Sequence, residues 1–93
     1  MTENEEYYRV TVRGIKLKVR KDAMDDINMV EDLGALQDGD IFALPRVLKR
    51  MFGDKYDVVK DRLANERHIT KVSDMTAFFE EVLLACNALD AKN

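Results

Sequence analysis

The chain of 93 residues contains one cysteine, one proline, one histidine and no tryptophan. The single cysteine, Cys86, excludes an intramolecular disulfide and a zinc site that needs several thiolates. Cys86 follows Val82 and Leu83 at helical spacing, and a free cysteine commonly behaves as a small buried hydrophobe. We therefore expect it in the core rather than in a reactive site.

Long apolar runs are also absent, since none approaches the roughly 20 residues that a membrane-spanning helix needs. The acidic beginning of the chain lacks the positive flank of a signal peptide. We expect a cytoplasmic protein with no membrane partner. Hydrophobic residues make up 46% of the chain and charged residues 35%, which is typical of one small folded domain. We expect this domain over residues 7–90, after a disordered start over residues 1–6.

Residue patterns for catalysis or cofactor binding are missing as well. His68 stands alone, without a nucleophile or an orienting carboxylate at a telling position. The four glycines form no phosphate-binding motif, and Asp38-Gly39-Asp40 lacks the alternate oxygen ligands and the terminal glutamate of a calcium loop. The sequence therefore predicts a protein without enzymatic activity, cofactor or metal.

The chain does contain charge, and this charge lies in blocks. Residues 7–21 carry six basic side chains and no acid, whereas residues 22–40 carry seven acids and no base. The basic block is suited either to gripping a phosphate backbone or to keeping an exposed strand edge soluble. Because the net charge is −3, we favour the second interpretation and expect no nucleic-acid partner.

Apolar and polar residues alternate over residues 7–20 on both sides of Gly14, which predicts a β-hairpin. Its expected inner face consists of Tyr8, Val10, Val12, Ile15, Leu17 and Val19.

Helical spacing of apolar residues follows the hairpin. It predicts helices at about residues 22–38, 42–52, 54–64 and 73–89, with Asp22, Asp54 and Ser73 as N-caps. The first helix is expected to bury Ala23, Ile27, Val30, Leu33 and Leu36 or Gln37; the second is expected to bury Leu44, Val47, Leu48, Met51 and Phe52. The predicted fold class is α+β and mostly helical: an N-terminal β-hairpin followed by about four α-helices in a small bundle.

The last predicted helix has a wide apolar stripe, and together with residues 41–42 and 51–52 it offers more hydrophobic area than a small core needs. Either the hairpin covers all of this area, or part of it forms a groove or a self-association face. Under the second interpretation, the candidate partner-binding residues are Phe42, Leu44, Arg46, Lys49, Met51, Phe52, Phe79, Leu83 and Leu84.

Several segments of the chain resemble tail assembly chaperones of long-tailed phages and prophages of Gram-positive bacteria. The resemblance covers roughly residues 10–89, and it rests on Val10–Gly14, Ile15–Val19, Lys21–Asp26, Val30–Leu33, Leu44–Leu48 and Met51–Gly53. The ending, residues 87–93, is similar to such proteins too.

This resemblance implies a non-enzymatic chaperone that coats the tape measure protein and holds it soluble until tail tube subunits polymerise around it. It implies a protein that works in the cytoplasm of a bacterial host and is absent from the mature virion, with the tail tube protein as a further partner. In many such phages a ribosomal frameshift makes a longer form, of which this sequence would be the short one. The opposite charge blocks also lead us to expect a homo-oligomer.

Two other classes of protein stay open. One is a small acidic phage or prophage protein that regulates or inhibits a single globular partner. The other is a nucleic-acid-binding accessory protein that uses the basic hairpin, whose binding would weaken steeply with salt.

Overall fold

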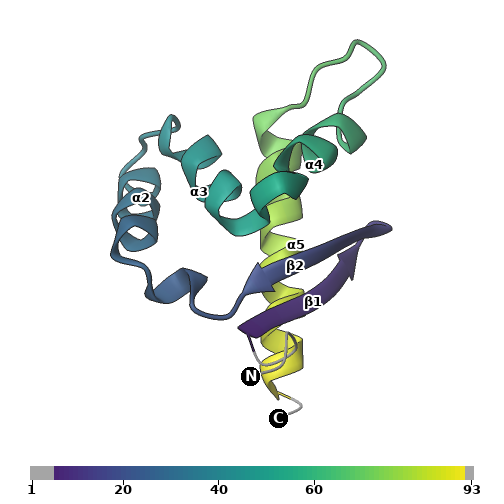
Figure 1. Ribbon diagram of the computed structural model, residues 1–93. Coiled ribbons are helices and arrows are strands. Elements are labelled where there is room, and N and C mark those ends of the chain that lie inside the picture. The colour runs from purple at the N-terminus through teal and green to yellow at the C-terminus, as the bar shows by residue number, and fades with distance from the viewer. Residues whose placement is uncertain (1–5, 92–93) are drawn as a thin grey trace.

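Figure 1 shows the computed structural model of the protein, which describes residues 6–91. The predicted disordered start, residues 1–6, lies outside the described residues except for Glu6. The elements are, in chain order, β1 (Tyr7–Val12), β2 (Ile15–Arg20), the 3₁₀ turn η1 (Ala23–Asp25), α2 (Ile27–Gln37), α3 (Ala43–Phe52), the 3₁₀ turn η2 (Gly53–Lys55), α4 (Tyr56–Arg62) and α5 (Val72–Ala91). The predicted α+β class with an N-terminal hairpin and a mostly helical remainder is confirmed.

β1 and β2 form the predicted antiparallel hairpin, because Arg13-Gly14 make a two-residue turn between them. Both turn residues have a positive φ, 52° and 79°, as the type I′ turns favoured in hairpins require. One face of the hairpin carries the cross-strand pairs Tyr8–Val19, Val10–Leu17 and Val12–Ile15. Apart from the half-buried Tyr8, these side chains are only 3–7% exposed, so the predicted inner face is confirmed.

The first predicted helix begins at the wrong residue. The side chain of Asp22 makes no cap hydrogen bond, and its carboxylate accepts a hydrogen bond of 3.0 Å from Arg20 Nε instead. The chain first makes the short turn η1, and α2 then begins at Ile27. Asp26 is the N-cap of α2, since its side chain accepts a hydrogen bond from the backbone N–H of Asn28. The N-cap is therefore Asp26, four positions after the predicted Asp22.

Because α2 begins later than predicted, the face that it buries also differs from the predicted one. Met29 is fully buried, and Leu33 and Leu36 pack partly buried against the core at helical spacing from it. Ile27 and Val30, which the sequence assigned to the core, are 66% and 50% exposed. The expected face was wrong because it was drawn through η1 as if one helix ran from residue 23 onward.

α3, η2 and α4 follow one another without a loop, so the helical part consists of three segments rather than about four separate helices. Gly53 ends α3 with a φ of 57°, a conformation that side chains with a Cβ rarely adopt. α4 begins at Tyr56, after the predicted cap Asp54, and α5 begins at Val72, before the predicted cap Ser73.

α5 passes behind the hairpin in Figure 1 and packs against β1, while α3 packs against β2. The buried stripe of α5 consists of Met75, Phe78, Phe79, Val82 and Cys86. The fully buried ring of Phe78 meets Phe52 of α3 edge to face, with ring centroids 5.6 Å apart. One core therefore joins the hairpin, α3 and α5, and the predicted burial of Cys86 is confirmed.

Two polar contacts fix the direction in which the hairpin crosses α5. The hydroxyl of Tyr8 donates to the carboxylate of Asp90 at 2.7 Å, and this hydrogen bond raises the pKa of Tyr8. At the other end of β1, the guanidinium of Arg13 pairs with Glu81, with Nε 3.2 Å from Oε1. Because Glu81 and Asp90 lie at different heights along α5, each anchors one end of the strand.

Replacement of Phe78 by alanine tests the importance of the seam between the hairpin and α5. We expect Phe78→Ala to lower the free energy of unfolding by about 3–5 kcal/mol, because it opens a cavity where three elements meet. Leu84→Ala is the matched control on the same helix, since Leu84 is 68% exposed, and it should change stability by less than about 0.5 kcal/mol. Urea unfolding followed by circular dichroism measures both, and equal losses would contradict this account of the core.

Candidate partner-binding surfaces

Four of the predicted partner-binding residues lie in the core. Leu44, Met51, Phe52 and Phe79 are 4%, 3%, 3% and 7% exposed. The first three occupy the inner face of α3 that the apolar spacing itself indicated, and all four belong to the buried core. They do not form an exposed apolar surface, although Met51 and Phe52 also line a groove that is described below.

The other candidates do reach the surface, but in two places. Phe42, at the N-cap of α3, is 79% exposed, and Arg46 and Lys49 are exposed on the same side of that helix at helical spacing. Leu84 is 68% exposed on α5, on the side away from the buried stripe, and Leu83 beside it is half-buried. The structure thus brings Phe42, Arg46 and Lys49 together, and we call these three residues the α3 outer face.

The α3 outer face combines a large aromatic ring with positive charge. Arg46 Nη1 donates to the backbone oxygen of Phe42 at 3.3 Å, which places the guanidinium next to the exposed residue. Further along, Lys49 Nζ lies 5.6 Å from the ring centroid of Tyr56, and Lys60 Nζ lies 5.4 Å from the same centroid. The exposed aromatic ring of Phe42 is thus followed along the surface by the cations of Arg46, Lys49 and Lys60.

Asp32 holds α2 against α3. Its carboxylate accepts hydrogen bonds from Arg46 Nε at 3.0 Å and from Arg50 Nε at 3.3 Å, and only 13% of its side chain is exposed. The hydrogen bond from Arg46 is the main cause that lowers the pKa of Asp32 below its ordinary value, against the opposing effect of desolvation. The carboxylate is therefore ionised at neutral pH and fixes the angle between the two helices.

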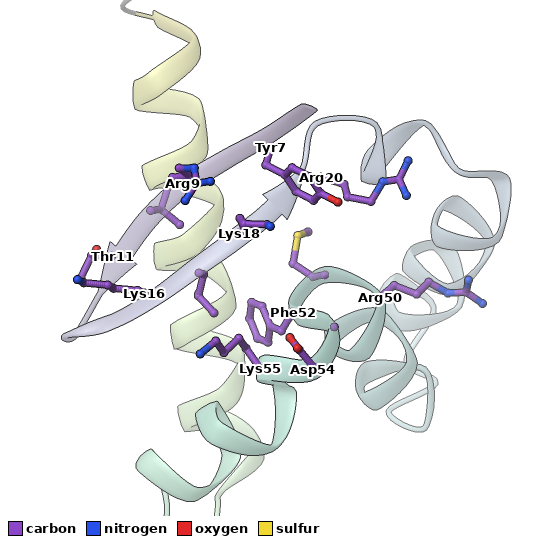
Figure 2. A pocket seen from close by; sticks show the side chains of 14 residues that line it. Tyr7, Arg9, Thr11, Lys16, Lys18, Arg20, Arg50, Phe52, Asp54 and Lys55 are labelled. Carbon is purple, nitrogen blue, oxygen red and sulfur yellow. The ribbon is translucent and has the colours of Figure 1, made fainter. Parts of the chain in front are cut away.

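A groove with a volume of about 580 Å³ lies between the outer face of the hairpin and the bend from α3 to α4. We call it the hairpin groove, and Figure 2 shows it from close by. The charged side chains that line it are Arg9, Lys16, Lys18, Arg20, Arg50, Lys55 and Asp54. Met51 and Phe52 form its floor, and Lys18 Nζ lies 4.6 Å from the ring centroid of Tyr7. Among the described residues that line the groove, six are basic and one is acidic.

Part of the hairpin groove could be predicted from the sequence. The alternation predicted that the basic residues of the hairpin share one face, and their exposure agrees with this. It gave no signal that Arg50 and Lys55, which follow far along the chain, complete the wall opposite β2. That juxtaposition depends on how α3 packs on the hairpin.

A third exposed surface lies on α2. Ile27 and Val30 are exposed, and Glu31 lies next to them on the same side of the helix. We call these three residues the α2 outer face. Asp25, close to it in the chain, is exposed as well, and residues 22–45 contain no basic residue. Sequence reasoning missed this surface because it placed Ile27 and Val30 in the core.

The side chains that could take part in metal binding or catalysis are the carboxylates, Cys86 and His68. Residues 6–91 contain no group of three histidine, cysteine, aspartate or glutamate side chains placed to hold a metal ion. Burial is the main cause that raises the pKa of the Cys86 thiol, which disfavours the reactive thiolate. His68 lies in the loop between α4 and α5, with a positive φ of 62°. Of the helices described, none is both long and apolar enough to cross a membrane.

Comparison with protein-family models, with curated proteins and with solved structures gives no match.

The pairing of Asp32 with two arginines predicts a pH-dependent contribution to stability. At neutral pH, Asp32→Asn should unfold at a lower temperature than the wild type, because the neutral amide lacks the charge that both guanidinium groups stabilise. The pKa of Asp32 is lowered in the folded state, so the wild-type advantage is complete above its ordinary value of 3.8. It is lost as the pH falls through the lowered value.

Thermal unfolding between pH 7 and pH 2 measures this difference. Asp57→Asn is the matched control, since Asp57 makes only an exposed contact of 3.5 Å with Lys60 and should change little at any pH. A constant difference between wild type and Asp32→Asn down to pH 2 would show that the carboxylate charge is not what joins α2 to α3.

Proposed function

We propose that the protein is a non-enzymatic phage tail assembly chaperone that binds the tape measure protein during tail morphogenesis. The observation that carries the proposal is the exposure of Phe42, 79% of whose surface is open to solvent beside Arg46 and Lys49. The sequence segments that resemble tail assembly chaperones of long-tailed phages support it, because they include residues 44–48 and 51–52 of α3.

The α3 outer face suits a helical client. A chaperone that keeps an amphipathic helix soluble needs an apolar contact for the client's apolar stripe and charged groups around it that stay hydrated. Phe42 offers the first, and Arg46 and Lys49 offer the second. The long aliphatic stems of these two side chains also add apolar contact area, while their charged groups stay in water.

The proposal is that of a binding protein rather than an enzyme. Catalysis by side chains requires a nucleophile or an acid–base pair in a shaped pocket. Most of the charged side chains that line the hairpin groove are lysine and arginine, and no histidine or cysteine is among the described residues around them. We infer that the protein acts in the bacterial cytoplasm and is left out of the mature virion.

Co-expression with the long, helix-rich protein encoded beside it tests the proposal. We expect a soluble complex with several copies of this chain per client, whereas the client alone aggregates. Phe42→Ser should reduce the amount of soluble client at least about tenfold, because truncation of an exposed aromatic anchor removes a dominant contact. Light scattering after size-exclusion chromatography measures the mass of the complex.

Ile69→Ser is the matched control, because Ile69 is also exposed, at 48%, but lies in the loop between α4 and α5. It should leave the yield of soluble client unchanged. A client that stays insoluble while this chain elutes alone would contradict the chaperone function for that pair. A one-to-one complex with a single folded protein would instead favour the small acidic regulator.

A further inference from the structure

We propose that the hairpin groove of one copy binds the α2 outer face of a second copy, so that the chain associates head to tail. This inference concerns two surfaces that lie outside the α3 outer face, and it holds whether or not the proposed client is present. It rests on the charge of the two surfaces, on their apolar content and on the directions in which they face.

The two surfaces carry opposite charge. Six basic side chains and one carboxylate, Asp54, are the charged groups that line the hairpin groove in the described part of the chain. Arg20 and Arg50 also pair with acids of their own chain, so Lys16 and Lys55 are the groove cations used in the test below. The segment from residue 24 to residue 42, which contains α2, carries six acids and no base. Complementary potentials of this kind speed the encounter of two surfaces and fix which way round they meet.

Their apolar groups also match. Ile27 and Val30 project from α2 into solvent beside Glu31. The groove is lined by Met51 and Phe52, each 3% exposed, and by the aliphatic stems of Lys16 and its basic neighbours. Figure 2 shows Phe52 between the hairpin and the bend at Asp54 and Lys55. An exposed apolar pair ringed by acids thus fits a hollow ringed by bases.

The two surfaces cannot meet within one chain. Met29 and Leu33 fix the opposite side of α2 on the core, and Asp32 ties it to Arg46 and Arg50 of α3. The α2 outer face is therefore directed away from its own molecule, and in Figure 1 α2 forms one edge of the protein. An acidic surface that faces outward can occupy a groove of this kind only on another molecule, and a second copy of the chain carries such a groove.

A contact between two different surfaces of the same chain leaves one free groove and one free α2 face at the ends of every complex. It therefore propagates into a ring or an open chain, unlike the self-complementary contact of a two-fold dimer. The expected species is a series of oligomers whose mean mass grows with protein concentration above the 10.7 kDa of one chain.

Charge-reversal variants of the full chain test this pairing. Glu31→Lys alters only the α2 outer face, and Lys16→Glu with Lys55→Glu alters only the groove; all three residues are exposed. We expect each variant to weaken self-association at least about tenfold, because like charges then face each other across the contact. Combining all three substitutions in one chain places a positive charge at position 31 of one copy opposite negative charges at positions 16 and 55 of the next, and it should restore association. Mixing the two single-surface variants should also restore it.

Sedimentation equilibrium at low and high salt measures the association, and circular dichroism checks that each variant is folded. Glu66→Lys is the matched control, since it makes the same change of charge in the exposed loop between α4 and α5 and should leave association unchanged. Ile27→Ser should weaken association at every salt concentration, because it removes apolar contact rather than charge.

Three results would overturn the proposal. One is a wild-type protein that stays monomeric at millimolar concentration and low salt. Another is an oligomer that neither single-surface reversal weakens, or that the combined reversal fails to restore. The third is a monomer whose groove binds a single-stranded oligonucleotide or an acidic peptide, with Lys16→Glu and Lys55→Glu abolishing that binding, which would assign the groove to another occupant. The client experiment with Phe42→Ser is read separately, so either proposal can fail alone.

Discussion

The seam between the inner face of the hairpin and the apolar stripe of α5 is the contact on which the other elements depend. A two-stranded hairpin is marginal in water unless its apolar face is covered, and α5 supplies that cover. Phe78 of α5 is fully buried, and its ring meets Phe52 of α3 edge to face. Because the hairpin, α3 and α5 share one core, the position of α3 relative to the hairpin depends on packing that involves all three elements.

The link between α2 and α3 is of a different kind. Met29 provides its one fully buried apolar contact from α2, and Asp32 provides its charge, shared between Arg46 and Arg50. A short helix held by so few groups does not need its whole apolar content for packing. The remainder, at Ile27 and Val30, is therefore left outside and is available to a partner.

A net charge of −3 conceals two surfaces of opposite sign. The basic block of the hairpin is extended by α3 and η2 into a groove, while the acidic block forms a separate edge of the molecule. This separation suits the proposed head-to-tail contact, since evenly mixed charges would give no preferred orientation. The exposed Phe42 stands at the junction of the acidic segment and the cationic row of α3, which leaves it accessible to a third molecule.

The elements themselves could be predicted from the sequence because local patterns determine them. Strict alternation around Gly14 predicted the hairpin and its inner face, and the spacing of Leu44, Val47 and Leu48 predicted the buried face of α3. The prediction failed where two local signals competed, since Asp22 and Asp26 are both suitable caps and only packing selects the second. It also used α3 twice, with Leu44, Met51 and Phe52 assigned both to the core and to a partner surface.

The sequence by itself determined the secondary structure, the lack of a multi-cysteine site and the presence of opposite charge blocks, because each of these depends on residues close together in the chain. Only the tertiary structure decided which apolar residues remain exposed and that Arg50 and Lys55 join the hairpin to form a groove. The physical reason is that burial is a property of the whole core: a side chain is hidden or exposed according to what distant segments pack upon it. No local pattern contains that information.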